Sequence, residues 1–279
     1  MNLKLLYITN RPDIALIAQN AGVDRIFIDL EYLGKSKRQA GRDTVKSMHE
    51  VSDIVKVKET LSTSELLVRV NPINEKSKNE IDDVIKAGAD IIMLPMINKI
   101  EEVNSFIKFV NNRCRTCLLI ETKQSVNIIE DIIKAAPRSE YFIGLNDLHL
   151  SYGQNFMFEP LASGKVEELC KLFKKHGLFY GFGGIARVGE GLLPAERIIA
   201  EHHRLGSGMV ILSRTFCDIA KSEKIEDIKN RMISGVSDIR RFETDLENYS
   251  DIEYLENTKQ VIKSVERIKQ IILDKKESN

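Results

Sequence analysis

The sequence has little that would place the protein in a membrane, on nucleic acid or in a disulfide-rich class. No apolar run approaches the roughly 20 residues needed to span a bilayer. The first residues, MNLKLLYITNRPD, reach polar residues too soon for a secretory signal peptide. Forty-one basic residues balance 41 acidic ones, so no net charge attracts nucleic acid or an anionic membrane. We therefore expect a cytoplasmic protein with neither a membrane nor a nucleic-acid partner.

Cysteine is also scarce, with four in 279 residues, which is too few for a disulfide framework in a chain of this size. Cys114 and Cys117 form a CxxC motif that leads into a predicted strand, whereas a thioredoxin-like motif would link a strand to a helix. No second CxxC completes a zinc site. Neither redox chemistry nor metal binding is expected of these two cysteines.

Eight short apolar runs alternate with amphipathic, charged segments. The runs are residues 3–9, 25–31, 66–71, 90–96, 117–122, 141–147, 179–184 and 208–213. Near-continuous apolar strands in turn with helices are typical of a parallel sheet covered on both faces. Eight such units predict an α/β fold of the (β/α)₈ TIM-barrel class, formed as a single domain over residues 1–279. A doubly wound sheet is the alternative, but it has fewer units, and no GxGxxG motif opens a helix here.

The chain continues beyond the eighth predicted strand for longer than one barrel helix requires. Residues 218–279 are highly charged and mostly of helical pattern. We predict a helical C-terminal extension that covers the barrel or packs on a neighbouring subunit of a homo-oligomer.

Polar residues gather where the predicted strands end, which is where barrels of this class carry their active sites. Asp29 and Glu31 end the second strand, Arg69 and Asn71 the third, Glu121 the fifth, Asp147 the sixth, and Arg214 the eighth. Because neighbouring strands lie about 4.8 Å apart, Glu121 and Asp147 are expected side by side. Two such carboxylates repel unless one is protonated or a cation bridges them.

A hard divalent cation, Mg²⁺ or Mn²⁺, suits two carboxylates with water and substrate as the other ligands. The alternative is that Asp147 caps the following helix and Glu121 pairs with a lysine. Arg69 on the same rim favours the metal site, because a fixed guanidinium binds a carboxylate substrate through two hydrogen bonds.

Five segments together resemble the HpcH/HpaI aldolase and citrate lyase β-subunit family, metal-dependent barrels of the phosphoenolpyruvate/pyruvate superfamily. The segments are GVDRIFIDLE, LVRVNP, AGADIIMLPM, LLIET and IGLNDLHLSYG, in the order of the family and within residues 20 to 155. The resemblance implies a TIM barrel and a carbon–carbon lyase of aldolase type that cleaves or forms a bond to the enolate of a pyruvate-like 2-oxoacid, with an aldehyde or acyl compound as the other substrate.

The resemblance also implies roles for individual residues. Glu121 and Asp147 fall on the metal ligands of the family, for Mg²⁺ or Mn²⁺. Arg69 falls on the arginine that binds the 2-oxoacid and stabilises the enolate. Asp29 and Glu31 fall on an acidic pair that orders metal-bound water. The backbone N–H groups around Leu145 and Asn146 are implied to meet the substrate carboxylate.

The sequence departs from the family at one place. A histidine that takes part in proton transfer normally follows the acidic pair, and Tyr32 stands there instead. The base is then a metal-bound hydroxide, Tyr32 or His149. The alternatives to an aldolase are a citrate lyase β-like or acyl-CoA lyase or synthase, and a non-catalytic barrel that acts as a binding subunit.

Overall fold

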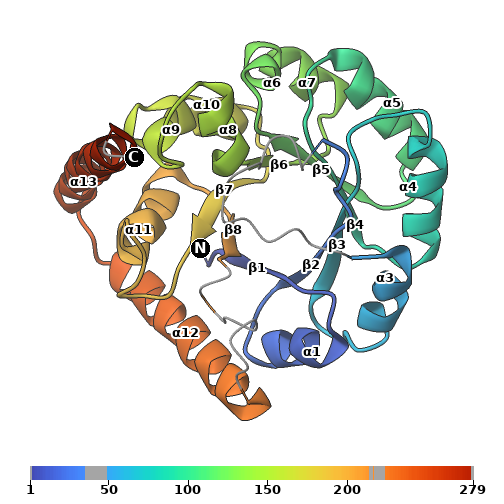
Figure 1. Cartoon of the computed structure of the whole chain (residues 1–279), viewed down its shortest axis with the longest axis horizontal. Helices are drawn as coiled ribbons and strands as arrows, with labels where there is room; N and C mark the ends of the chain where they lie inside the picture. The colour runs from blue at the N-terminus through green and yellow to red at the C-terminus, as the bar shows by residue number, and fades with distance from the viewer. Residues whose placement is uncertain (1, 35–48, 214–215, 217–223, 278–279) are drawn as a thin grey trace. The chain divides into compact units, whose positions relative to one another are not determined.

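The computed structural model describes residues 2–34, 49–213, 216 and 224–277 (Figure 1). Its strands confirm the eight predicted ones. They are β1 Lys4–Ile8, β2 Arg25–Asp29, β3 Glu65–Arg69, β4 Ile91–Leu94, β5 Arg115–Ile120, β6 Glu140–Ile143, β7 Tyr180–Ile185 and β8 Met209–Leu212. The strand order is that of a closed barrel, β1 through β8 in sequence. The predicted (β/α)₈ TIM barrel with additional C-terminal helices is therefore confirmed.

Helices follow the strands in turn. They are α1 Pro12–Asn20, α3 Val51–Lys58, α4 Ser77–Lys86, α5 Ile100–Val110, α6 Lys123–Asn127, α7 Ile129–Ala135, α8 Leu145–Ser151, α9 Glu159–Ala162, α10 Lys165–Lys175, α11 Ala195–Leu205, α12 Ile225–Leu246 and α13 Asp251–Glu277. No helix in the described ranges combines the length and the apolar character needed to cross a membrane.

The chain forms two compact units. The first, Leu6–Tyr141, holds the parallel ladder from β2 to β5, with helices α3, α4 and α5 on its outside (Figure 1). β2 and β4 are buried along their whole length, which explains why their sequences are apolar without alternation. The register pairs Asp29 with Arg69, so the last residues of β2 and β3 lie opposite one another.

The second unit consists of Met1–Leu5 and Phe142–Asn279. Its strands β7 and β8 pair closely because β7 is rich in glycine: a Cβ at Gly181 would lie 2.2 Å from the carbonyl oxygen of Met209. Gly183 has a φ of +55° and packs against Leu145. Close approach of the Met209 backbone thus explains Gly181, and a positive φ with close packing against the Leu145 side chain explains Gly183.

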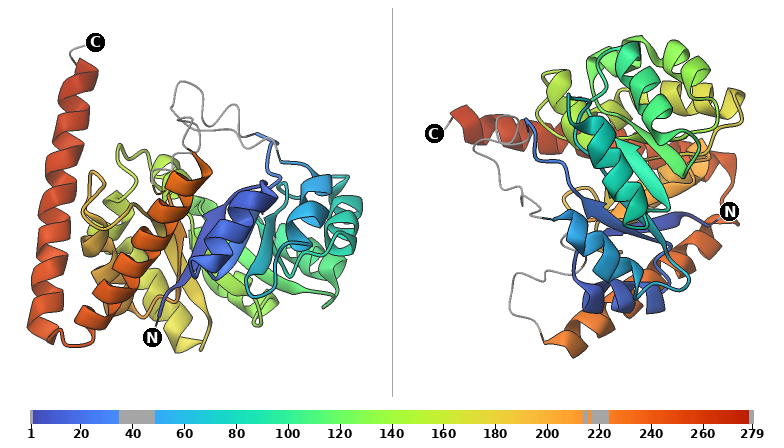
Figure 2. Two further views of the ribbon diagram at one scale, coloured as in Figure 1. Left: turned by 90° about the horizontal axis from the view of Figure 1, so that it is seen from below. Right: turned by 90° about the vertical axis from the view of Figure 1, so that its right-hand side faces the viewer.

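The described part of the C-terminal extension forms helices α12 and α13, as predicted. Its last helix, α13, lies against α11 and α9 in the second unit (Figure 2). The buried carboxylate of Glu201 on α11 accepts hydrogen bonds from Asn257 Nδ2 at 2.9 Å and Thr258 Oγ1 at 2.7 Å, both on α13. Buried polar bonds of this kind fix the position of α13 along α11.

The sixth strand is shorter than predicted. We expected a strand over 141–147, but β6 ends at Ile143 and α8 begins at Leu145, with Gly144 as its N-cap residue. Asp147 is therefore in the first turn of a helix, where a negative charge is favourable, and does not alternate with Leu145 as it would on a strand.

The burial of His202 on α11 leads us to expect that the free energy of unfolding depends strongly on pH. Its ring is fully buried and stacked on Phe182 at 3.7 Å, and Nδ1 lies 2.7 Å from Ser207 Oγ. Burial lowers the pKa of His202 from 6.5 to about 3. Below pH 6.5 the unfolded chain binds a proton that the folded chain excludes, so stability falls as the pH falls. At pH 5 this amounts to about 2 kcal/mol.

The expected result is that His202→Gln loses less unfolding free energy between pH 7.5 and pH 5 than the wild type, as measured by urea denaturation. The exposed His176 supplies the matched control, since His176→Gln should leave the pH dependence unchanged. Equal pH dependence in the wild type and His202→Gln would show that this histidine does not control acid stability.

Candidate active site

Arg69 and Asp29 form the centre of the candidate site, at the carboxyl ends of β3 and β2. The guanidinium binds the carboxylate through two hydrogen bonds, Nε to Oδ1 at 2.9 Å and Nη2 to Oδ2 at 2.8 Å. It also lies over the ring of Phe27, with 5.6 Å between Cζ and the ring centroid. A two-point ion pair in register between neighbouring strands holds Arg69 in one orientation.

Two further carboxylates converge on the same guanidinium. Arg69 Nη2 lies 3.4 Å from Glu31 Oε2, and the charge of Glu121 also acts on Arg69. Burial alone lowers the pKa of Arg69, but the charges of the three carboxylates outweigh burial, so the pKa lies above its ordinary value and Arg69 stays protonated. The three carboxylate residues are each only 2% exposed. The sequence predicted all four residues at this rim, and the structure brings them together.

Glu121 is fixed by the backbone of the loop that follows β4. Its Oε1 accepts a hydrogen bond from the N–H of Met96 at 2.9 Å, and Met96 has a φ of +53°. A left-handed conformation at a residue other than glycine is uncommon and costs energy. Here it turns a backbone N–H toward a carboxylate that the sequence predicts as a metal ligand.

Asn71, which the sequence placed on the rim, forms a second network with the half-buried Glu80, a residue that sequence reasoning missed. Asn71 Oδ1 accepts hydrogen bonds from the backbone N–H groups of Tyr32 and Leu33, each at 3.0 Å. Its Nδ2 donates to Glu80 Oε1 at 2.7 Å. Burial raises the pKa of Glu80 above its usual range, against the opposing effect of the Asn71 hydrogen bonds. This network fixes the chain directly after the acidic pair.

Tyr32, which the sequence offered as a base, is 66% exposed. A histidine contacts the acidic pair: the backbone N–H of Asp29 donates to His49 Nδ1 at 3.0 Å. His49 precedes α3, and nothing in the spacing of the sequence connects it with β2. A catalytic role for Tyr32 stays a prediction.

The second compact unit carries the other predicted site residues, all on α8. Leu145 is buried, Asn146 is exposed and Asp147 is half-buried in the first turn. His149 is 5% exposed, and its Nδ1 lies 3.1 Å from the carbonyl oxygen of Leu145. The metal role of Asp147, the substrate role of the Leu145 and Asn146 amides and the base role of His149 stay predictions. Arg214 lies outside the described residues.

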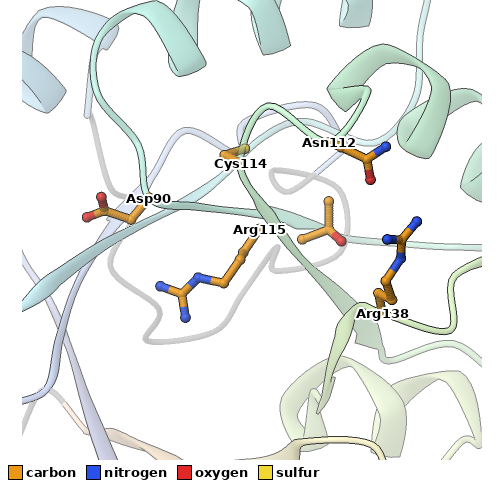
Figure 3. A pocket seen from close by; sticks show the side chains of 6 residues that line it. Asp90, Asn112, Cys114, Arg115 and Arg138 are labelled. Carbon is orange, nitrogen blue, oxygen red and sulfur yellow. The ribbon is translucent and has the colours of Figure 1, made fainter.

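A hollow of about 460 Å³ lies at the amino ends of the strands, away from the carboxyl ends that carry Arg69. It is lined by Asp90, Asn112, Cys114, Arg115, Thr116 and Arg138. Figure 3 shows Asn112 and Arg138 on one side of it and Asp90 on the other. Asp90 is paired with Lys58, and Arg115 is paired with Glu65. Most of the charge that lines the hollow is therefore already compensated within the protein. Burial raises the pKa of Cys114 to about 11, and the thiol is not reactive at neutral pH.

The side chains around Arg69 supply oxygen donors of the chemical type that a divalent cation binds. The three buried carboxylates have three negative charges, whereas the guanidinium that they share has one positive charge. Oxygen ligands of this kind are those that Mg²⁺ and Mn²⁺ prefer. In the described part of the chain, no three His, Cys, Asp or Glu side chains stand in a metal-binding arrangement by themselves. A cation here would need water or substrate oxygens to complete its ligands.

Comparisons with known proteins point to one family. The family model described as HpcH/HpaI aldolase/citrate lyase matches residues 4–157, more than half of the chain. No curated protein sequence matches the chain.

Two solved structures share the fold. A crystal structure of an HpcH/HpaI aldolase/citrate lyase family protein from Burkholderia cenocepacia J2315 has a TM-score of 0.59 at 14% identity, covering 76% of this chain and 88% of that one. An HpcH/HpaI aldolase from Desulfitobacterium hafniense DCB-2 has a TM-score of 0.59 at 15% identity, covering 86% and 93%. At such identities the likeness shows the fold alone.

Proposed function

The chain belongs to the HpcH/HpaI aldolase/citrate lyase family, and from that premise we propose that it is a divalent-metal-dependent carbon–carbon lyase. The proposed reaction cleaves or forms the bond between the enolate of a pyruvate-like 2-oxoacid and an aldehyde or ketone. The observation that carries the proposal is the convergence of Asp29, Glu31 and Glu121 on the single guanidinium of Arg69.

Arg69 is the residue that stabilises charge in this proposal. When the carbon–carbon bond breaks, a base takes the hydroxyl proton of the fragment that leaves as the aldehyde or ketone. The electron pair of the bond passes to the 2-oxoacid and leaves a negative charge on the former keto oxygen. A guanidinium already fixed by Asp29 needs no reorganisation to meet that charge. The pair with Asp29 occupies Nε and Nη2, which leaves Nη1 as the donor for substrate.

Glu121 and Asp147 would hold Mg²⁺ or Mn²⁺ in this proposal. The bound cation supplies Lewis-acid polarisation of the keto oxygen. Asp29 and Glu31 accept hydrogen bonds as carboxylates, so they would orient water and keep the guanidinium in place. The Met96 N–H on Glu121 Oε1 fixes one oxygen of that carboxylate and thereby the direction of the other.

Thermal stabilisation tests the metal role of Glu121. Mg²⁺ with pyruvate, each at about 100 times its dissociation constant, should stabilise the folded wild type by about 2.7 kcal/mol or more. For a chain of this length that raises Tm by about 5 to 10 °C. Glu121→Gln, which keeps size but removes the charge, should lose this increase.

The matched control is Glu130→Gln on α7, where the carboxylate is exposed. It should keep the full increase in Tm. A wild type with no response to Mg²⁺, Mn²⁺ or pyruvate would contradict the lyase proposal and favour a non-catalytic binding subunit.

A further inference from the structure

Asn71 holds the chain on both sides of Glu31. Its Nδ2 donates to the carbonyl oxygen of Leu30 at 3.2 Å, and its Oδ1 accepts the backbone N–H groups of Tyr32 and Leu33, each at 3.0 Å. The Leu30 carbonyl and the Tyr32 N–H belong to the two peptide groups that flank the Cα of Glu31. One buried side chain therefore binds both peptide groups of a carboxylate residue in the candidate site.

The side-chain amide of Asn71 replaces a bond of the ladder between β2 and β3. The backbone N–H of Leu30 donates to the carbonyl oxygen of Arg69 at 2.9 Å. A parallel ladder continued by one step would bring the backbone N–H of Asn71 to the carbonyl oxygen of Leu30. The side-chain Nδ2 of Asn71 occupies that carbonyl oxygen instead. A side-chain amide can do so because it has the donor and the acceptor of a peptide group.

Glu80 diverts the backbone of Asn71 from the ladder. Its Oε1 accepts both the backbone N–H of Asn71 at 3.1 Å and Nδ2 at 2.7 Å. Glu80 lies in the first turn of α4. The loop before α4 is closed by Asn74, whose N–H donates to Ser77 Oγ and whose Nδ2 donates to the carbonyl oxygen of Pro72, each at 2.9 Å. The carboxylate of Glu80 is thus held at Asn71 by an ordered turn.

The amide of Asn71 satisfies all these partners in one orientation only. Rotation by half a turn would place Oδ1 against the Leu30 carbonyl oxygen and Glu80 Oε1, so that acceptors would face acceptors. It would also place Nδ2 against two backbone N–H groups. Backbone donors and acceptors are not interchangeable, so they determine the orientation of the amide. The chain at Glu31 therefore has one position relative to the end of β3.

Glu31 needs this support more than Asp29 does. The register of the ladder places Asp29 opposite Arg69, and Asp29 Oδ2 lies 2.8 Å from Arg69 Nη2. Glu31 lies two residues beyond the end of β2, where that register no longer applies. Its Oε2 lies 3.4 Å from the same Nη2. The peptide groups that carry this longer contact are those that Asn71 binds.

We propose that Asn71 and Glu80 are positioning residues of this site, which together hold the carboxylate of Glu31 at Arg69. The inference rests on the proposed function for its effect on the reaction. Each residue acts through Glu31, which keeps the guanidinium in place as charge grows on the keto oxygen. A displacement of about 1 Å in such a site costs up to about 100-fold in rate.

Amide hydrogen exchange tests the contact without reference to activity. Glu80→Met removes the acceptor, so Asn71 can return its backbone N–H to the ladder and release the segment that it holds. The N–H groups of Tyr32 and Leu33 should then exchange at least about tenfold faster than in the wild type. The N–H of Leu30, which is bonded within the ladder, is the internal control and should stay protected. Unchanged exchange at Tyr32 and Leu33 would overturn the proposal.

A double-mutant cycle with Glu31→Gln shows whether the effect on the reaction passes through Glu31. We expect Glu80→Met to lower kcat for exchange of the C3 hydrogens of pyruvate about 10- to 100-fold with little change in KM. In the Glu31→Gln background it should cost less than about threefold more, because the residue that it positions is already altered. Losses of equal size in both backgrounds would contradict a role through Glu31.

Two further variants separate positioning from a general loss of stability. Glu80→Gln keeps a carbonyl oxygen as the acceptor for Asn71, so it should retain most of the amide protection and most of the wild-type kcat. Glu75→Met, at an exposed residue before α4, is the matched control and should keep the wild-type rate. A loss in Glu80→Gln as large as that in Glu80→Met would contradict the acceptor role.

The failure of this inference and the failure of the proposed function give different results. A wild type and a Glu80→Met variant that exchange pyruvate hydrogens equally fast would refute the positioning role and leave the lyase intact. A wild type without any exchange would refute the lyase, and a crystal structure of Glu80→Met would then test the positioning role alone. That role predicts a distance between Glu31 Oε2 and Arg69 Nη2 beyond about 4 Å, the limit of an ion pair. A distance still at 3.4 Å would overturn it.

Discussion

Arg69→Lys is expected to lower kcat/KM for Mg²⁺-dependent exchange of the C3 hydrogens of pyruvate by about 10²- to 10³-fold. Lysine keeps the positive charge but has no planar fork, so it cannot bind both oxygens of Asp29 and still present a donor to substrate. The three carboxylates remain partly compensated, and the folded state should survive. Loss of tritium from C3-labelled pyruvate measures the exchange without knowledge of the aldehyde partner.

The matched control is Arg113→Lys, because Arg113 is also paired with an aspartate, Asp82, but is 41% exposed and lies before β5. It should leave the exchange rate unchanged. A rate in Arg69→Lys within about threefold of the wild type would show that the guanidinium only compensates the carboxylates. The enolate would then need another source of stabilisation.

The strands could be predicted because their signal is local. Each strand is a run of four to six residues, most of them buried on both faces, and the chain had to be apolar there. The register between β2 and β3 adds what periodicity cannot show. It places Asp29 opposite Arg69, so these two predicted rim residues form an ion pair. Their placement at a common rim followed from the fold class, since the carboxyl ends of parallel strands meet.

The errors and omissions have physical causes. The sequence IGLND continues the apolar run of β6, and only the backbone shows that Gly144 starts a helix there. His49 reaches Asp29 across residues that separate β2 from α3, and its position depends on Asn10, Asp53 and the helix cap acting together. No spacing rule connects such residues. The backbone conformation of Met96 was also unpredictable, because a positive φ at methionine has no sequence signature.

Arg25 is expected to dominate stability in the first compact unit. It is the first residue of β2 and is 1% exposed. Its guanidinium binds Glu140 through Nη1 at 2.5 Å and Nη2 at 2.8 Å, and Glu65 through Nε at 2.9 Å. Arg25→Met removes the positive charge and leaves the largely buried carboxylate of Glu140 without its main partner. The free energy of unfolding should fall by about 3–5 kcal/mol, as measured by urea denaturation.

The double variant Arg25→Met with Glu140→Met should recover most of that loss, because two apolar side chains of similar volume replace the buried pair. Arg113→Met, at an exposed ion pair, should cost less than about 1 kcal/mol. A double variant as unstable as the single one would show that the pair itself, rather than an uncompensated charge, holds the unit together.

Arg25 and Glu140 both begin strands, whereas the candidate site occupies strand ends. The double variant should therefore exchange pyruvate hydrogens at the wild-type rate, since ion pairs at the amino ends of barrel strands serve stability and those at the carboxyl ends serve chemistry.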